Sequence, residues 1–196
     1  PDVLPPETNT MTHPMIRAVL AVPFAVLGLS TVALADGYRD TDAPMQVDTR
    51  LDPSRYLGSR YEIARFPNSF EKGCEGVTAE YSSLPDGRIK VVNTCRKGAP
   101  DGPAESAEGV ARVIAPGMLE VNFVSWLRFL PFTWGDYWVL DGDADHQVAV
   151  AGTPSGKQGW ILARSPEISA DQLAEAKSVL RDNGYDIRAL KMVPQK

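Results

Sequence analysis

Eight short segments with the alternating polarity of β-strands follow one another between residues 61 and 164, and the lengths of their connections alternate. The second, fourth and sixth connections are short turns such as Leu84–Gly87, where Pro85 presets φ and Gly87 supplies a positive φ. The first, third and fifth connections are long and comprise residues 67–74, 96–105 and 125–136. The segments are Tyr61–Phe66, Val77–Tyr81, Ile89–Asn93, Glu108–Ile114, Met118–Phe123, Tyr137–Leu140, Gln147–Ala151 and Gly159–Arg164.

This alternation of connection lengths constrains the fold. Successive connections of an up-and-down meander lie at opposite ends, so the sequence predicts one tight end and one end that carries long loops. The predicted fold class is therefore all-β, an eight-stranded antiparallel up-and-down β-barrel (a calyx) wide enough to hold one small ligand. A β-sandwich would contain similar strands but would not require this alternation.

One helix follows the predicted strands. Ser169 and Gln172 form a capping-box pattern, Gly184 is a C-terminal stop, and apolar residues recur between them at helical spacing. We expect this C-terminal α-helix to pack outside the barrel. Residues Ile187–Val193 are predicted to form a last strand at the barrel seam.

The N-terminal part has the pattern of an export signal. Arg17 precedes an apolar run that ends in Ala33-Leu34-Ala35 before the polar Asp36, and this arrangement is typical of a secretory signal peptide. A single membrane anchor is the alternative, because residues 18–35 are nearly long enough to span a bilayer. We expect residues 1–35 to be an upstream extension and signal peptide, residues 36–50 a linker, and residues 51–196 the barrel domain.

Charge and composition exclude several classes of protein. The net charge is −5, whereas a nucleic-acid binder would show a basic face. The chain has only two histidines, His13 and His146, which excludes a multi-histidine metal site, and we expect no metal. No phosphate-binding loop or dinucleotide fingerprint is present, so no cofactor is expected.

Cys74 and Cys95 lie on either side of the Leu84–Gly87 turn, roughly opposite each other on adjacent predicted strands. In an exported chain the expected state is a disulfide, which would stabilise the fold by about 3 kcal/mol. The alternative is a reactive thiol, which needs cationic neighbours to lower its pKa. Lys72 and Arg96 are adjacent in sequence, so this alternative stays open.

The fifth connection is unusually apolar for a long loop. Exposed apolar loops mark a ligand mouth, a membrane contact or a partner surface, although such rings can also cap a barrel core. Arg128 and Asp136 place charge beside a ligand head group in the first of these interpretations. The apolar side chains are Trp126, Leu127, Phe129, Leu130, Phe132 and Trp134.

Three polar-tipped residues lie within the predicted strands. An inward Glu62 implies a partner or a raised pKa, because an unpaired carboxylate is costly in an apolar interior; a solvent-facing Glu62 implies neither. Tyr137 combines an apolar ring with one hydroxyl, which suits contact with a lipid head group. Tyr81 has the same chemistry, and both residues are also ordinary strand aromatics.

Four runs of residues together resemble the lipocalin family, specifically the bacterial outer-membrane lipocalins of the apolipoprotein D-like group. They are Tyr56–Phe66, Val77–Ser82, Gly135–Leu140 and Trp160–Pro166, in family order. The resemblance implies a calyx that binds fatty acids, lysophospholipids or another small apolar molecule. For such a ligand, the candidate binding residues are those singled out above: Glu62, Tyr81, Trp126, Arg128, Phe129, Phe132, Trp134 and Tyr137.

The chain departs from the family at one motif. The family pattern Gly-x-Trp-Tyr is here Gly58-Ser59-Arg60-Tyr61. The resemblance implies that the missing tryptophan would close the barrel floor against an arginine matching Arg164. Arg60 and Arg164 are therefore expected to pack at the barrel floor with two guanidinium groups near each other.

The sequence thus predicts a non-enzymatic protein of the cell envelope, periplasmic or secreted, that carries or scavenges a small apolar ligand. Contact with the outer membrane as a peripheral protein is compatible with it, as are a monomer and a homodimer. Two alternatives stay open: a lipocalin-type enzyme that uses a free thiol, and an envelope barrel whose apolar loop binds a protein partner.

Overall fold

The computed structural model describes residues 1–2, 37–142 and 145–196. The predicted signal segment therefore lies outside the described residues. In the described part, no helix is both long enough and apolar enough to cross a bilayer.

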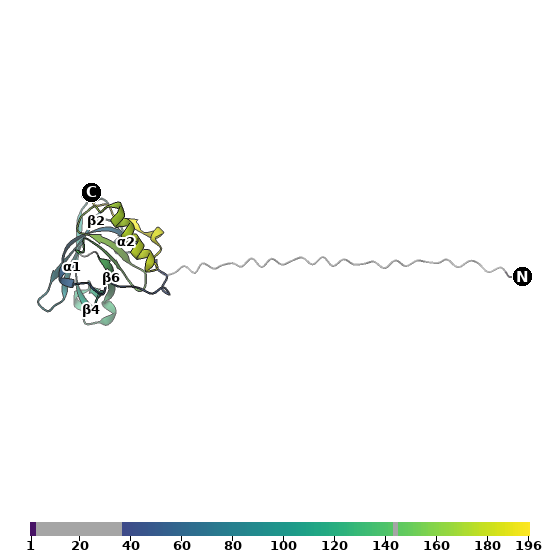
Figure 1. Cartoon of the computed structure of the whole chain (residues 1–196), viewed down its shortest axis with the longest axis horizontal. Coiled ribbons are helices and arrows are strands. Elements are labelled where there is room, and N and C mark those ends of the chain that lie inside the picture. The colour runs from purple at the N-terminus through teal and green to yellow at the C-terminus, as the bar shows by residue number, and fades with distance from the viewer. Residues whose placement is uncertain (3–36, 143–144) are drawn as a thin grey trace. The chain divides into compact units, whose positions relative to one another are not determined.

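Eight antiparallel strands close into a barrel, as predicted (Figure 1). Each strand pairs with the next along the chain, and β1 pairs with both β2 and β8, which closes the sheet. All eight strands differ by one to four residues at one or both ends from the segments read off the sequence, and β3 continues four residues beyond its predicted end. Their bounds are β1 Gly58–Arg65, β2 Cys74–Ser83, β3 Ile89–Lys97, β4 Ala104–Ala115, β5 Met118–Asn122, β6 Gly135–Gly142, β7 Val148–Gly152 and β8 Gly159–Ala163.

The long connections gather at one end of the barrel, here called the loop end. It carries residues 66–73, 98–103 and 123–134, together with the shorter β7–β8 connection. The opposite end, here called the turn end, carries the tight β2–β3 and β4–β5 connections. The short helix α1 (Pro53–Tyr56) leads directly into β1 at the turn end. The 3₁₀ helices η1 (Ser125–Leu127) and η2 (Pro131–Thr133) lie in the β5–β6 connection.

Alternation along the strands separates two apolar cores. Val139 and Ala149 face the interior of the barrel, whereas the next residues, Leu140 and Val150, face outward. The outer core lies under α2 (Ala170–Asp182), which packs against the outside of the barrel as predicted (Figure 1). The predicted capping box is present, because Ser169 and Gln172 each accept a hydrogen bond from the other's backbone N–H.

The C-terminal segment differs from its prediction. Of the expected strand Ile187–Val193, only β9 (Lys191–Met192) is a strand, and it pairs with β1 at Ala64 and Arg65. The 3₁₀ helix η3 (Ile187–Ala189) replaces the first part, because Asp186 accepts a hydrogen bond from the Arg188 backbone and starts a helical turn.

Residues 37–50, which we expected to be a linker, make defined contacts with the barrel. The buried Arg39 side chain donates to the carbonyl oxygen of Asn183 at 2.7 Å. The Tyr38 ring stacks on Phe66 with 5.0 Å between ring centroids, and Phe66 stacks in turn on Tyr185. This segment therefore extends the outer core beyond α2.

Candidate ligand-binding site

The interior of the barrel is lined by one continuous set of apolar side chains. They come from the inward-facing positions of β2 to β7 and from the segment that precedes β1. Several are small, which limits the side-chain volume that the walls contribute. The buried members are Leu51, Tyr56, Ala79, Tyr81, Ile89, Val91, Ala111, Leu119, Val139 and Ala149, with Leu57, Val121 and Tyr137 packed against them.

Three tyrosine hydroxyls meet within this apolar lining. The Tyr137 hydroxyl lies 2.9 Å from that of Tyr56 and 3.3 Å from that of Tyr81. Burial raises the pKa of all three phenols, so each stays protonated at neutral pH. The structure thus brings the predicted residues Tyr81 and Tyr137 together and adds Tyr56, which the sequence pattern did not single out.

Arg60 occupies the floor at the turn end and is fully buried. Its guanidinium lies 4.1 Å from the centroid of the Tyr56 ring and donates to the carbonyl oxygen of His146 at 2.7 Å. A second donor of the same group is 3.4 Å from the Tyr56 carbonyl oxygen. The cation–π contact and the carbonyl groups take the place of the aromatic packing that a tryptophan would supply here.

Arg164 reaches the same end from the outside. It donates to the carbonyl oxygens of Ser59 and Arg55. Burial lowers the pKa of Arg164, and the nearby charge of Arg60 lowers it further. Gly58 permits this approach, because its φ is +94° and a Cβ there would lie 2.9 Å from Nη1 of Arg164.

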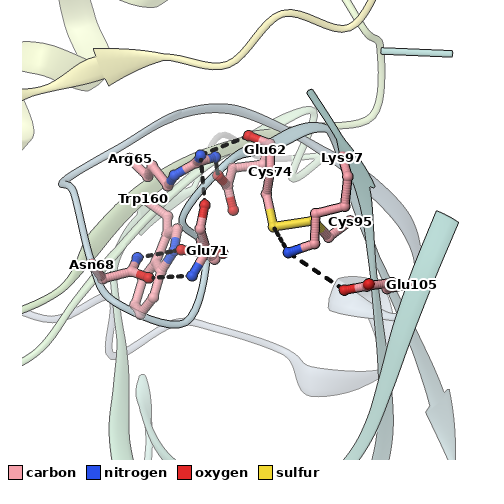
Figure 2. The surroundings of a disulfide bond; sticks show 9 residues. All are labelled: Glu62, Arg65, Asn68, Glu71, Cys74, Cys95, Lys97, Glu105 and Trp160. Carbon is pink, nitrogen blue, oxygen red and sulfur yellow. Dashed lines mark hydrogen bonds and ion pairs between the residues drawn. A yellow bond between two sulfur atoms is a disulfide. The ribbon is translucent and has the colours of Figure 1, made fainter. Parts of the chain in front are cut away.

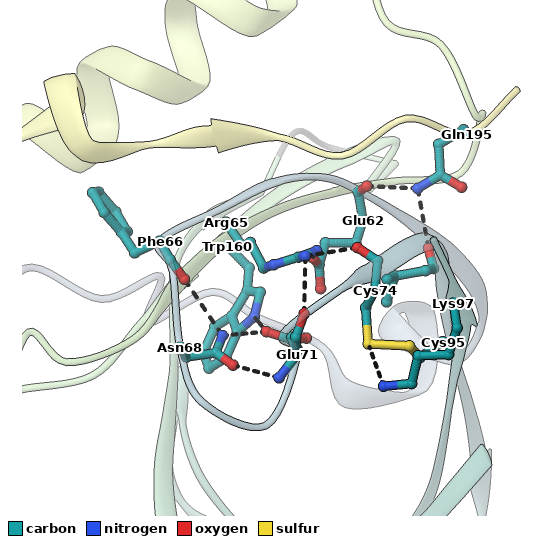
Figure 3. Close-up of polar contacts among 11 residues, drawn as sticks. Glu62, Arg65, Phe66, Asn68, Glu71, Cys74, Cys95, Lys97, Trp160 and Gln195 are labelled. Atoms are coloured by element: carbon teal, nitrogen blue, oxygen red, sulfur yellow. Dashed lines mark hydrogen bonds and ion pairs between the residues drawn. A yellow bond between two sulfur atoms is a disulfide. The ribbon is translucent and has the colours of Figure 1, made fainter. Parts of the chain in front are cut away.

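A second polar group lies inside the loop end (Figures 2 and 3). Glu62 is 3% exposed and accepts a hydrogen bond from Arg65 at 2.7 Å, so it faces inward with a partner. Arg65 also donates to the carbonyl oxygens of Glu71 and Cys74. The Glu71 carboxylate accepts from the Trp160 indole at 3.3 Å and from the Asn68 amide.

The carboxylates of Glu62 and Glu71 and the guanidinium of Arg65 set the charge of this group. Burial raises the pKa of Glu62 well above its ordinary value, and the neighbouring Glu71 carboxylate raises it further. Arg65 opposes this rise without cancelling it. The inward Glu62 therefore binds a proton more readily than a carboxyl in water does.

The disulfide between Cys74 and Cys95 is present, as predicted (Figure 2). It joins the first residue of β2 to β3 at the loop end, and the Lys97 ammonium lies 3.7 Å from Cys74 Sγ. The described residues contain no free cysteine. A thiol-based reaction has no reduced sulfur to start from in this state.

The aromatic side chains of the β5–β6 connection point outward. Trp126, Phe129 and Phe132 are 75%, 78% and 78% exposed, so they do not cap the barrel core. The connection is ordered by Asn122, whose amide donates to both oxygens of Thr133.

Trp134 also lies away from the interior. The Trp134 ring lies 4.2 Å from the guanidinium of Arg112, which pairs with Glu120 on the outer face of the barrel. The Trp134 indole donates to the backbone carbonyl of the half-buried Arg128. The structure therefore separates the predicted binding residues into an inner set (Glu62, Tyr81, Tyr137) and a loop set (Trp126, Arg128, Phe129, Phe132, Trp134).

The sequence pattern missed four inward groups: Tyr56, Arg65, Glu71 and Trp160. Trp160 belongs to one of the four family-like runs, and its place on β8 two residues before Leu162 is a usable signal. Glu71 carried no signal, because it belongs to a loop.

Two further hollows lie on the surface and open to solvent. One of about 490 Å³ is bounded by residues 37–38, the β1–β2 connection and Lys157. Another of about 290 Å³ is bounded by residues 49–53 and the β4–β5 turn. Neither includes the inward tyrosines. Within the described ranges, no group of three His, Cys, Asp or Glu residues is arranged to hold a metal ion.

Comparison with known proteins matches this geometry. Residues 51–195 match the family model of the lipocalin-like domain. Temperature-induced lipocalin-1 of Arabidopsis thaliana is 35% identical over 158 residues, covering 77% of this chain and 83% of that protein. Outer membrane lipoprotein Blc of Escherichia coli K12 is 39% identical over 154 residues, covering 76% and 82%. The solved structure of the cockroach allergen Per a 4 has a TM-score of 0.62 at 17% identity, covering 78% of this chain and 94% of that one, which supports the shared fold.

Proposed function

The chain belongs to the lipocalin family, whose members bind small hydrophobic ligands, and from this premise we propose that it carries or scavenges fatty acids or lysophospholipids outside the cytoplasm. The proposed binding residues inside the barrel are Glu62, Tyr81 and Tyr137. Lipocalin relatives are generally binding proteins without enzymatic activity, and we propose the same for this chain. The closed Cys74–Cys95 disulfide is in keeping with this, because a thiol-dependent enzyme would need a reduced cysteine.

The apolar lining of the barrel interior is the observation that carries the proposal. Ala79, Ala111 and Ala149 lie among its inward positions, so the walls contribute little side-chain volume there. An eight-stranded barrel is wide enough for one small ligand when side chains do not fill it. Each acyl methylene buried contributes about 0.8 kcal/mol before the costs of ordering, so an alkyl chain needs few specific contacts.

The proposed location rests on two observations. A relative from Escherichia coli is named an outer membrane lipoprotein, and residues 15–35 have the pattern of an export signal. A periplasmic or secreted protein, in peripheral contact with a membrane, is in keeping with both.

We further propose that the β5–β6 connection (residues 123–134), here called the aromatic loop, contacts a lipid surface during ligand loading and release. Trp126, Phe129 and Phe132 expose three large rings at the loop end, where a ligand enters or leaves the barrel. Trp is favoured at membrane interfaces because its apolar ring carries a polar N–H group, and exposed apolar patches mark membrane contacts.

Ligand binding is tested by native mass spectrometry of the purified exported protein and by titration with a fluorescent fatty acid. Retained lipid or saturable binding of one ligand per chain is expected. A protein that retains no lipid and shows no saturable binding of fatty acid or lysophospholipid would contradict the proposal.

Membrane contact is tested separately by vesicle sedimentation with phosphatidylethanolamine and phosphatidylglycerol. A variant carrying Trp126→Ser and Phe129→Ser should lose vesicle binding while its affinity for soluble fatty acid stays unchanged. The matched control is Ile114→Ser, which removes an apolar side chain that is 49% exposed near the turn end. Equal vesicle binding by the loop variant and the control would refute the membrane contact.

A further inference from the structure

We propose that the turn end of the barrel is an anion-binding floor, which receives the carboxylate of a fatty acid head first while the alkyl chain points toward the loop end. The donors are Arg60 and the hydroxyls of Tyr56, Tyr81 and Tyr137. This inference rests on the proposed function and adds the charge and orientation of the ligand.

Arg60 is a buried cation without a counter-charge. None of the ion pairs in the described part of the chain involves it. A guanidinium has five N–H donors. Among the residues that the structure describes, Arg60 forms two hydrogen bonds, and its Nε is buried without a hydrogen-bond partner. Burial of an unpaired charge is costly, so a bound anion would stabilise this end of the barrel.

The tyrosine hydroxyls supply a further donor. Three hydroxyls carry three hydrogens, and the two hydrogen bonds among Tyr56, Tyr81 and Tyr137 use two of them. One hydrogen is therefore left for an outside acceptor. The positive charge of Arg60 partly offsets the rise in the pKa of Tyr56 and Tyr81 that burial causes, and the Glu62 carboxylate adds to that rise at Tyr81. An anion between these groups would meet donors from both.

Neighbouring charges at the turn end strengthen the site. Arg164 adds a second guanidinium close enough to interact with Arg60. Two exposed carboxylates near this end are used elsewhere: Asp52 accepts hydrogen bonds from Ser54, and Asp145 pairs with Arg55. They do not neutralise Arg60.

The loop end has the opposite character. Arg65 is already engaged by Glu62 and by backbone carbonyls, and the Glu71 carboxylate lies beside them (Figure 3). A ligand carboxylate held beside Glu62 and Glu71 would face two acidic groups, and Arg65, the cation between them, is already engaged. The interior therefore disfavours an anion near the entrance and favours it at the floor, which sets the direction of binding.

The primary test is carbon NMR of palmitate labelled at its carboxyl carbon, bound to the full unmodified protein. Near Arg60, the bound carboxyl should stay ionised at a lower pH than in a free fatty acid. A bound carboxyl that titrates at a higher pH than free palmitate would overturn the proposal, because a guanidinium partner favours the ionised form of a carboxyl.

The second test compares affinities for palmitate and hexadecanol, which differ in head-group charge. Arg60→Gln should weaken palmitate binding by about tenfold or more, as expected for a lost charge-assisted hydrogen bond, and leave hexadecanol nearly unchanged. Arg112→Gln is the matched control, because it removes the same charge from the outer wall. Arg60→Trp, which restores the family residue, gives the same readout if the glutamine variant does not fold.

The outcomes separate this inference from the proposed function. If the unmodified protein binds neither compound nor a lysophospholipid, the proposed function fails and the inference fails with it. If both compounds bind and their affinity ratio is the same in the unmodified protein and both Arg60 variants, only the anion-binding floor is refuted.

Discussion

The disulfide offers the most quantitative test of how this barrel is stabilised. Cys74 and Cys95 are separated by 21 residues, and their bond closes a loop through the whole β2–β3 hairpin. In the chain-entropy treatment, a loop of this length destabilises the unfolded state by about 3 kcal/mol at 25 °C. For a domain of about 150 residues, that difference lowers the melting temperature by roughly 6–12 °C when the bond is reduced.

The assay is urea unfolding of the same protein with and without a reducing agent, followed by tryptophan fluorescence. Reduction keeps both side chains in place, so the comparison isolates the covalent bond from the packing of Cys74 against Val77 and Val193. The double variant Cys74→Ser, Cys95→Ser serves as a control, and the reducing agent should leave its stability unchanged. A loss below about 1 kcal/mol on reduction would refute the entropic account.

Three further predictions follow from single contacts. Because burial and Glu71 raise the folded-state pKa of Glu62 above its ordinary 4.5, the wild type should lose stability as pH rises from 4.5 through the folded pKa. Glu62→Gln should remove that loss of stability. Urea unfolding of both proteins at about pH 5 and about pH 8 measures it, and the same pH dependence in both would contradict the prediction. Ser169→Ala should cost about 1 kcal/mol through loss of the helix cap, measured by the unfolding midpoint. Gly58→Ala should cost more than Gly87→Ala, because both have positive φ but only Gly58 lies against Arg164; equal thermal shifts would show that the contact adds nothing.

The fold was predictable because its signals are local and repeated. Alternating connection lengths identified the loop end, and Ser169 with Gln172 marked the start of α2 within one residue. These patterns arise from turn geometry and helix capping, which depend on neighbours in sequence.

The candidate site was predictable only in part. Alternation from Arg60 places Glu62 on the same face of β1, but a register shift between Glu62 and Ala64 breaks the period and brings Arg65 inward as well. Glu71 reaches the interior through its contacts with Asn68 and Trp160, and Trp160 lies 89 residues away in sequence. Such positions depend on tertiary contacts, so periodicity alone does not reveal them.

The aromatic loop shows a further limit of sequence reasoning. A run of apolar side chains has the same composition whether it caps a core or faces solvent. The contacts of Asn122 with Thr133 and of Trp134 with Arg112 decide the outcome, and they leave Trp126, Phe129 and Phe132 outside.

The seam between β1 and β2 is bridged by Gln195, a residue far from both strands in sequence. Gln195 donates to the carbonyl oxygens of Glu62 and Val77, which precede it by 133 and 118 residues (Figure 3). During synthesis from the N-terminus, these bonds cannot form until residue 195 has left the ribosome. Contacts this distant in sequence form slowly, so the two carbonyl groups stay without this partner until the C-terminal segment has folded back onto β1.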